Sequence, residues 1–240
     1  GRLKLIIRGG VGVDNIDVAY AEQKGIAVRN TPRASSDAVA ELALGHMFSV
    51  ARYISAAGHT MRTGGWEKKA YKGIELTGRT VGIVGYGRIG QALGRRCQAL
   101  GMKVLAYDVY QNRDLECATM RYVELDELLA QSDIISLHVP SLPGQPLINA
   151  KTIARMKDGV ILINTSRGTN VDEEALLAAL ESGKVYGAGL DVFAEEPPKN
   201  AALLAHPRVS ATPHIGASTV EAQKRIGAEI VSLIGEQFGL

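Results

Sequence analysis

Val81-Gly-Ile-Val-Gly-Tyr-Gly-Arg-Ile-Gly90 is the stretch from which the fold of this chain can be predicted. An apolar, β-branched run enters three glycines, Gly85, Gly87 and Gly90, with the spacing G-x-G-x-x-G. Between a strand and a helix, the first glycine allows a tight turn, the second lets a pyrophosphate approach the backbone, and the third lets the helix pack closely. The N–H groups and the dipole of the helix N-terminus then face the phosphates. The stretch therefore predicts a dinucleotide-binding turn.

The sequence that follows the turn supports this interpretation, which glycines alone would leave weak. A second predicted strand, 103–107, ends in Asp108, 18 residues after Gly90. An acid at this point can accept hydrogen bonds from an adenosine ribose and would repel a 2′-phosphate. Asp108 therefore favours NAD over NADP, although the nearby Arg113 keeps NADP open as an alternative.

The composition is that of an ordinary globular protein. Hydrophobic residues make up 46% of the sequence and charged residues 22%. The length of 240 residues is sufficient for one large domain or two small ones. A formal charge of +2 gives no reason to expect nucleic acid or a membrane as partner. No apolar segment approaches the roughly 20 residues that cross a bilayer. Cys97 and Cys117 lack metal-ligand spacing, so no metal is expected, and they fit a reducing cytoplasm.

Strands and helices alternate from Thr80 onward, which is typical of a doubly wound parallel α/β sheet. Near-continuous apolar strands such as Val160-Ile-Leu-Ile163 suit a sheet that is covered on both faces. The predicted strands are 80–84, 103–107, 134–138, 160–164, 185–190 and 208–211, and the predicted helices are 88–100, 124–131, 150–156, 172–182 and 217–235.

The first part of the chain contains other elements. A strand at Leu3–Ile7 has no partner before it, which indicates a missing segment. A short helix capped by Asp14 or Asn15 and a strand at 26–28 should follow.

A long helix is predicted from Ser35 or Ser36 to about Ala57. Its polar residues form a narrow stripe and most of its circumference is apolar. Such a helix is buried on several sides. We therefore expect it to lie between two lobes and against a second subunit.

Reactive side chains follow three of the predicted strands, at the carboxyl ends where an open parallel sheet binds its ligand. Arg167 follows strand 160–164, Glu195-Glu196 follows strand 185–190, and His214 follows strand 208–211. Arginine offers a planar fork for a substrate carboxylate, and histidine can exchange a proton near neutral pH. Beside a nicotinamide this set suits oxidation of a secondary alcohol next to a carboxylate, with the histidine taking the hydroxyl proton as hydride moves to the ring.

Each of these residues also has a structural interpretation. Arg167 could be a surface charge, the two glutamates before Pro197 could be solvated loop acids, and a single histidine is more often structural than catalytic. Their joint position at strand ends near a dinucleotide turn favours function. Among the other histidines, only His138, at a strand end before Pro140, has a position worth testing.

Five ordered segments resemble the NAD-dependent D-2-hydroxyacid dehydrogenases, most closely the D-3-phosphoglycerate dehydrogenase branch. The resemblance covers nearly the whole chain. It implies that Arg167 holds the substrate carboxylate, that His214 is the acid/base, and that Glu196 is the partner of the histidine. The segments are Val11-Gly-Val-Asp-Asn-Ile-Asp17, Gly85-Tyr-Gly-Arg-Ile-Gly90, Asn164-Thr-Ser-Arg-Gly168, Leu190-Asp-Val-Phe-Ala-Glu-Glu-Pro197 and Pro213-His-Ile-Gly-Ala-Ser218.

The resemblance also implies that NAD is held at these strand ends. Arg88 and Ile89 would contact the pyrophosphate, Asp108 the ribose, and Asp191 the region of the carboxamide. Val11 and Val139 stand where hydroxyl residues are common, which weakens the choice of substrate more than the choice of cofactor. The full set of expected cofactor contacts is Gly85, Gly87, Arg88, Ile89, Gly90, Asp108, Val139, Thr165, Ser166, Asp191 and Gly216.

The domain organisation and the activity follow from the same resemblance. Residues 1–33 and 216–240 would belong to an incomplete flavodoxin-like substrate lobe and 34–215 to a Rossmann nucleotide domain, in a homodimer. The implied reaction interconverts a D-2-hydroxy acid and its 2-oxo acid, as in phosphoglycerate dehydrogenase. The alternatives are a glyoxylate or hydroxypyruvate reductase and an NAD(H)-sensing, corepressor-like binding protein. Formate oxidation is disfavoured because that branch has glutamine where Glu196 stands here.

Overall fold

The computed structural model of the protein describes residues 2–141 and 143–240. Their contacts divide the chain into two compact units, Gly1–Val39 with Gly216–Leu240, and Ala40–Ile215. The first boundary falls within helix α2 (Ser36–Arg52). The two units are described separately below.

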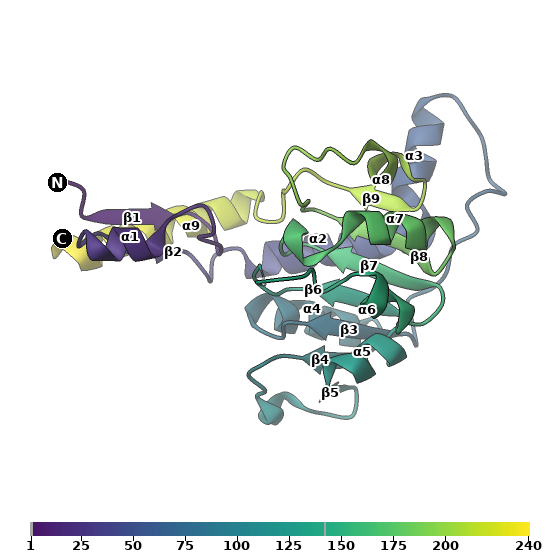
Figure 1. The fold of residues 1–240 in the computed structure, drawn as a ribbon, viewed down its shortest axis with the longest axis horizontal. Coiled ribbons are helices and arrows are strands. Elements are labelled where there is room, and N and C mark those ends of the chain that lie inside the picture. The colour runs from purple at the N-terminus through teal and green to yellow at the C-terminus, as the bar shows by residue number, and fades with distance from the viewer. Residues whose placement is uncertain (1, 142) are drawn as a thin grey trace. The chain divides into compact units, whose positions relative to one another are not determined.

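The larger unit is built on a parallel sheet of seven strands (Figure 1), in the order β5-β4-β3-β6-β7-β8-β9. The chain runs outward from β3 through β4 to β5, then returns to place β6 on the other side of β3. The point between β3 and β6 is therefore the topological switch point, where doubly wound sheets bind nucleotides. The strands are β3 (Thr80–Val84), β4 (Lys103–Tyr107), β5 (Met120–Tyr122), β6 (Ile134–Leu137), β7 (Val160–Asn164), β8 (Val185–Leu190) and β9 (Val209–Ala211).

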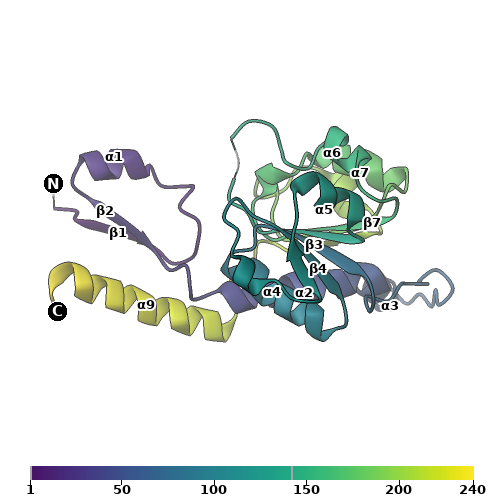
Figure 2. The same ribbon diagram turned by 90° about the horizontal axis from the view of Figure 1, so that it is seen from below.

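Helices cover both faces of this sheet (Figure 2). Helices α5 (Leu125–Gln131), α6 (Ala150–Ala154) and α7 (Glu173–Glu181) lie on one face, and α2 and α4 (Arg88–Ala99) lie on the other. The remaining helical segments connect strands. They are α3 (Ile54–Arg62), α8 (Ala201–Ala205) and the 3₁₀ turns η1 (Arg113–Leu115) and η2 (Gly168–Asn170).

The residues of β7 show how the sequence dictates this arrangement. Val160 and Leu162 belong to the core beneath α5, α6 and α7, whereas Ile161 and Ile163 belong to the core beneath α2 and α4. Successive side chains of a strand point to opposite faces, so a strand that is covered twice must be apolar at every position. Each such side chain contributes roughly 1.5–3 kcal/mol when fully buried.

The prediction of one helix from Ser35 or Ser36 to about Ala57 is wrong in its length. Helix α2 ends at Arg52, and Tyr53 adopts a left-handed backbone (φ 56°, ψ 31°) before α3 begins. No glycine or proline marks the break. The ring of Tyr53 packs against Tyr71 and Tyr186, with centroids 5.8 and 6.0 Å away. Tertiary packing of an aromatic side chain thus accompanies a turn that helix periodicity does not reveal.

The smaller unit contains two parallel strands, β1 (Leu5–Arg8) and β2 (Ala27–Asn30), and helices α1 (Val18–Gln23) and α9 (Val220–Phe238). The side chain of Asp17 caps α1 by accepting the N–H of Tyr20, so the predicted cap at Asp14 or Asn15 is wrong.

Helix α9 packs within this unit at the end of β1. A Cβ on Gly9 would lie 3.0 Å from Cγ2 of Ile226, and Arg225 Nε donates to the carbonyl of Ala34 at 2.8 Å. Among the described residues, no helix has the length and apolarity to cross a membrane.

Candidate cofactor and active site

The three glycines after β3 differ in what they permit. Gly85 has φ +90°, and a Cβ there would lie 2.5 Å from the carbonyl oxygen of His138. A Cβ on Gly90 would lie 2.2 Å from the carbonyl oxygen of Gly85, so α4 packs closely only because this side chain is absent. A Cβ on Gly87 would meet no described atom within 4 Å. The turn is tight at its first glycine, open at the second and packed at the third.

Asp108 is tied to this turn by its carboxylate. Its Oδ2 accepts the N–H of Tyr86 at 2.7 Å, and its Oδ1 accepts the N–H of Tyr110 at 3.0 Å. Arg113 contacts its own loop instead, with a hydrogen bond to Gln111 at 3.0 Å. In this structure the acid, and not the arginine, therefore lies at the glycine turn. Arg88 and Ile89 form the first turn of α4, with Arg88 exposed and Ile89 half-buried.

His138 and Val139 lie at the end of β6, beside the turn. The N–H of His138 donates to Val84 at 2.7 Å, and its Nε2 lies 2.9 Å from Ser136 Oγ. Burial lowers the pKa of His138 to about 4, so the ring is neutral at pH 7. Its Nδ1 is inaccessible and has no hydrogen-bond partner in the described part of the chain. Asn170 Nδ2 donates to the carbonyls of Val139 and Pro140, which fixes this loop against the next one.

The loop after β7 is held by Asn164, which is fully buried. Its Oδ1 accepts from both the N–H and the hydroxyl of Ser166, at 3.0 and 2.8 Å, and its Nδ2 donates to the carbonyl of Arg167 at 2.9 Å. The hydroxyl of Thr165 is buried and lacks a partner among the residues described. Asn164 lies in one of the quoted segments, but nothing in its residue type distinguished it as the residue that positions Arg167.

Gly168 brings the loops after β7 and β8 together. A Cβ on Gly168 would lie 1.8 Å from the carbonyl carbon of Phe193, so the two backbones touch. The loop after β8 is fixed from the other side, because the N–H of Ala194 donates to Glu173 at 2.8 Å. Arg167, adjacent to this contact, is therefore anchored next to the loop that carries Glu196.

Glu196 and His214 form a direct pair. His214 Nδ1 lies 2.8 Å from Glu196 Oε2, and the two side chains are 45% and 40% exposed. His214 has a left-handed backbone, with φ +53°. A carboxylate accepts hydrogen bonds only, so the proton of this contact is on Nδ1, and Nε2 of the neutral ring carries the lone pair. In this tautomer Nε2 can accept a proton.

Asp191 connects the ends of β8 and β9. It is 1% exposed, and its Oδ1 accepts from the hydroxyl of Thr212 at 2.6 Å and from the N–H of Ile215 at 2.8 Å. His46 of α2, a residue for which the sequence predicts no role, contacts Thr212 and Ser210 with its two ring nitrogens, at 3.0 and 3.1 Å. The partners lie 166 and 164 residues away, so no local pattern could reveal this contact.

The structure thus brings the predicted Glu196 and His214 into contact and places the other expected residues of the larger unit at strand ends of one sheet. Gly216 belongs to the smaller unit.

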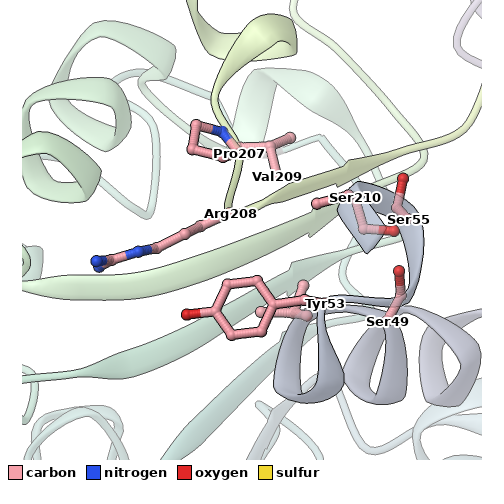
Figure 3. Close-up of a pocket in the computed structure, with 9 residues that line it drawn as sticks. Ser49, Tyr53, Ser55, Pro207, Arg208, Val209 and Ser210 are labelled. Carbon is pink, nitrogen blue, oxygen red and sulfur yellow. The ribbon is translucent and has the colours of Figure 1, made fainter. Parts of the chain in front are cut away.

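A separate, small hollow lies between the end of α2, the start of α3 and β9 (Figure 3). It faces the amino end of β9, whereas parallel sheets bind ligands at the carboxyl ends. No predicted site residue lines it. The lining residues are Ser49, Val50, Tyr53, Ser55, Ala56, Pro207, Arg208, Val209 and Ser210.

Residues 44–216 match the family model of the D-isomer specific 2-hydroxyacid dehydrogenase, NAD binding domain. The chain belongs to the NAD-dependent D-2-hydroxyacid dehydrogenase family, whose members are oxidoreductases that act on CH–OH donors. The hydroxypyruvate reductase of Thermotoga maritima is 52% identical over an alignment of 243 positions, which covers 99% of this chain and 78% of that protein. The D-3-phosphoglycerate dehydrogenase of Methanocaldococcus jannaschii is 47% identical over an alignment of 240 positions, which covers 99% of this chain but 45% of that protein.

A solved structure leads to the same family. The crystal structure of D-lactate dehydrogenase from Aquifex aeolicus, complexed with NAD and lactic acid, has a TM-score of 0.88 and 36% identity, covering 99% of this chain and 79% of that one. The predicted family, the doubly wound fold and NAD as cofactor are confirmed. The site fits the cofactor physically, because the Gly87 backbone is open and the buried Thr165 hydroxyl has no described partner.

Proposed function

We propose that Arg167, Glu196 and His214 interconvert a D-2-hydroxy acid and its 2-oxo acid. The observation that carries this proposal is the 2.8 Å contact between His214 Nδ1 and Glu196 Oε2, at the carboxyl edge of the sheet that holds the NAD-binding turn. A histidine that can accept a proton at its second nitrogen, together with an arginine on an anchored loop of the same sheet edge, is the minimum set for removing a proton from an alcohol beside a carboxylate.

The roles follow from the chemistry of the side chains. The turn formed by Gly85, Gly87 and Gly90 would hold the cofactor, and NAD, when bound, would supply the hydride acceptor for C2 of the hydroxy acid, as NADH would supply the hydride donor for the oxo acid. Arg167 binds the substrate carboxylate through its planar fork. His214 Nε2 takes the hydroxyl proton in the oxidation direction and gives it back in reduction. Glu196 fixes the tautomer of His214 and stabilises the imidazolium that forms.

Among possible substrates, we propose small 2-oxo acids of the hydroxypyruvate type. The support is the higher identity to a hydroxypyruvate reductase, 52%, together with coverage of 78% of that protein. The second candidate is a phosphorylated 2-oxo acid, which the 47% identity to a phosphoglycerate dehydrogenase supports.

The test is NADH oxidation by the full-length protein with hydroxypyruvate, glyoxylate and phosphohydroxypyruvate. Glu196→Gln should lower kcat roughly 10²- to 10⁴-fold, the usual range for losing acid–base assistance, with little change in the Kd for NADH. The matched control is Glu195→Gln, because Glu195 is the neighbouring acid and pairs with the exposed Lys199 instead. NADH binding without turnover of any 2-oxo acid would instead indicate a corepressor-like binding protein.

We also propose a homodimer located in the cytoplasm. Among the described residues, helix α3 contains none that is buried, although several of its side chains are apolar. Ile54 and Met61 in this helix, and Trp66 after it, are more than half exposed. Apolar surface of this kind is typical of a subunit interface. Light scattering coupled to size exclusion should give twice the subunit mass, and cell fractionation tests the location.

A further inference from the structure

His46 interrupts an otherwise apolar helix face. It is 3% exposed and lies among Ala43, Met47 and Val50, which also face the sheet. A buried imidazole must find hydrogen-bond partners for its nitrogens, because an unpaired buried polar group is costly. Both nitrogens have them: Nδ1 lies 3.1 Å from Ser210 Oγ, and Nε2 lies 3.0 Å from Thr212 Oγ1.

Asp191, which can only accept, determines which atom donates in each of these hydrogen bonds. Thr212 donates to Asp191 Oδ1 at 2.6 Å, and a hydroxyl has a single proton to donate. Thr212 Oγ1 must therefore accept from His46, which places a proton on Nε2. Burial lowers the pKa of His46, an effect that outweighs the opposing charge of Asp191. The neutral ring then accepts at Nδ1 from the hydroxyl of Ser210. All three hydrogen bonds point the same way, from Ser210 toward Asp191.

The chain of hydrogen bonds ends beside the catalytic pair. The oxygen of Asp191 that accepts from Thr212 also accepts the N–H of Ile215 at 2.8 Å. Ile215 directly follows His214, whose left-handed backbone (φ +53°) must be held by its neighbours. The segment from Thr212 to Ile215 is thus fixed at both ends by one carboxylate.

Two glycines in β8 allow α2 to come close enough for this contact. A Cβ on Gly189 would lie 2.5 Å from the Cβ of His46, and a Cβ on Gly187 would lie 2.6 Å from Cγ1 of Val50. Gly187 and Gly189 are two residues apart and so lie on the same face of the strand, and His46 and Val50 are four apart and so lie on the same face of the helix. The two faces are in contact. Val50 makes the same kind of helix–strand contact as His46, but its apolar side chain forms no hydrogen bond.

We propose that His46 is a positioning residue, which orients Thr212 and Asp191 as an Nε2–H donor and, through Asp191, fixes the backbone that carries His214. His46 touches neither substrate nor cofactor. The effect on turnover rests on the proposed function of His214, whereas the tautomer and the direction of the hydrogen bonds do not.

The structural part is tested by long-range ¹H–¹⁵N spectra of the imidazole rings in the full-length ¹⁵N-labelled protein. His46, assigned with His46→Gln, should show a pyrrole-like Nε2 and a pyridine-like Nδ1 at pH 7. Thr212→Val should shift the Nε2 resonance. An Nδ1–H tautomer, an imidazolium, or a spectrum that Thr212→Val leaves unchanged would overturn the proposal.

The kinetic part compares three variants in NADH oxidation. His46→Leu, which cannot donate, should lower kcat about tenfold or more, since small misplacements of reacting groups are costly, with less than about a threefold change in the Kd for NADH. His46→Gln retains a donor and should recover most of that loss. Val50→Ala, which disturbs the same interface, should keep kcat near the wild-type value.

Equal losses in His46→Leu, His46→Gln and Val50→Ala would mean that packing, and not the hydrogen bond, is responsible, and would overturn the positioning role. If the wild-type protein turns over no 2-oxo acid, the proposed function fails, while the NMR result still decides the hydrogen-bond direction. The melting temperature of each variant, by circular dichroism, shows whether it is folded.

Discussion

The buried ring of His138 should make the stability of the protein depend on pH. As a residue His138 is half-buried, but its Nδ1 is inaccessible and unpaired among the described atoms. Desolvation lowers its pKa from 6.5 to about 4. The unfolded chain therefore binds this proton more tightly than the folded one. The stability that the protein has with His138 neutral is therefore fully present above pH 6.5, and it is lost as the pH falls toward 4, because protons then bind preferentially to the unfolded chain.

The size of the effect follows from the two pKa values. One pKa unit corresponds to about 1.4 kcal/mol, so the full difference is about 3 kcal/mol. At pH 5 the ring is almost fully protonated in the unfolded chain and about a tenth protonated in the folded one, and about 2 kcal/mol of stability is lost. This is a large share of the roughly 5–15 kcal/mol that stabilises a typical domain.

Urea unfolding in the absence of NAD, followed by circular dichroism at pH 8 and pH 5, measures this loss. His138→Gln should lose about 2 kcal/mol less than the wild type between the two pH values, because the constant cost of the substitution cancels in the difference. His59→Gln is the control, since His59 is exposed and should leave the pH dependence unchanged. Equal losses in all three proteins would refute the claim that His138 is neutral because it is buried.

Four other substitutions test the packing and the cofactor site. Gly168→Ala should destabilise the protein by about 3 kcal/mol or more in urea unfolding, because its Cβ would overlap the backbone of Phe193. Gly45→Ala, at a helical site with no described atom within 4 Å of the new Cβ, should stabilise it by about 0.5–1 kcal/mol in the same assay. Asp108→Ser should reduce the preference for NADH over NADPH about tenfold or more in fluorescence titrations, since the charge that repels a 2′-phosphate is removed. Arg155→Ala should change the unfolding free energy by less than about 0.5 kcal/mol, because its ion pair with an aspartate of α5 is exposed.

The strands that enclose the site could be predicted because their sequence signal is local. Runs of β-branched and aliphatic residues, bounded by glycine or a polar residue, specify a strand buried on both faces without knowledge of its neighbours. The strand β5, of three residues, and the helix α8, of five, were not predicted. Four strands have the predicted bounds: 80–84, 103–107, 160–164 and 185–190.

The residues that hold the site together could not be predicted in the same way. Motif and strand-end position identify Glu196 and His214 as candidates, and the pair is in contact. The contact of His46 with Thr212 joins segments 166 residues apart, and the left-handed turn at Tyr53 accompanies aromatic packing from two other segments. These features depend on tertiary structure and leave no local pattern in the sequence.

The site combines reactive groups that are at least partly exposed with acceptors that are buried or half-buried. Asp108, Asn164 and Asp191 each lie at a strand end, and each accepts a backbone N–H from a loop of the site. His214 and Arg167 are attached to loops fixed in this way, although His214 itself is half exposed. A reactive side chain can thus stay hydrated, and avoid the cost of burying its charge, while its backbone keeps the geometry that the reaction needs. The rigidity of the site therefore comes from these amide and carboxylate acceptors, so a substitution that leaves every reactive group in place can still impair turnover.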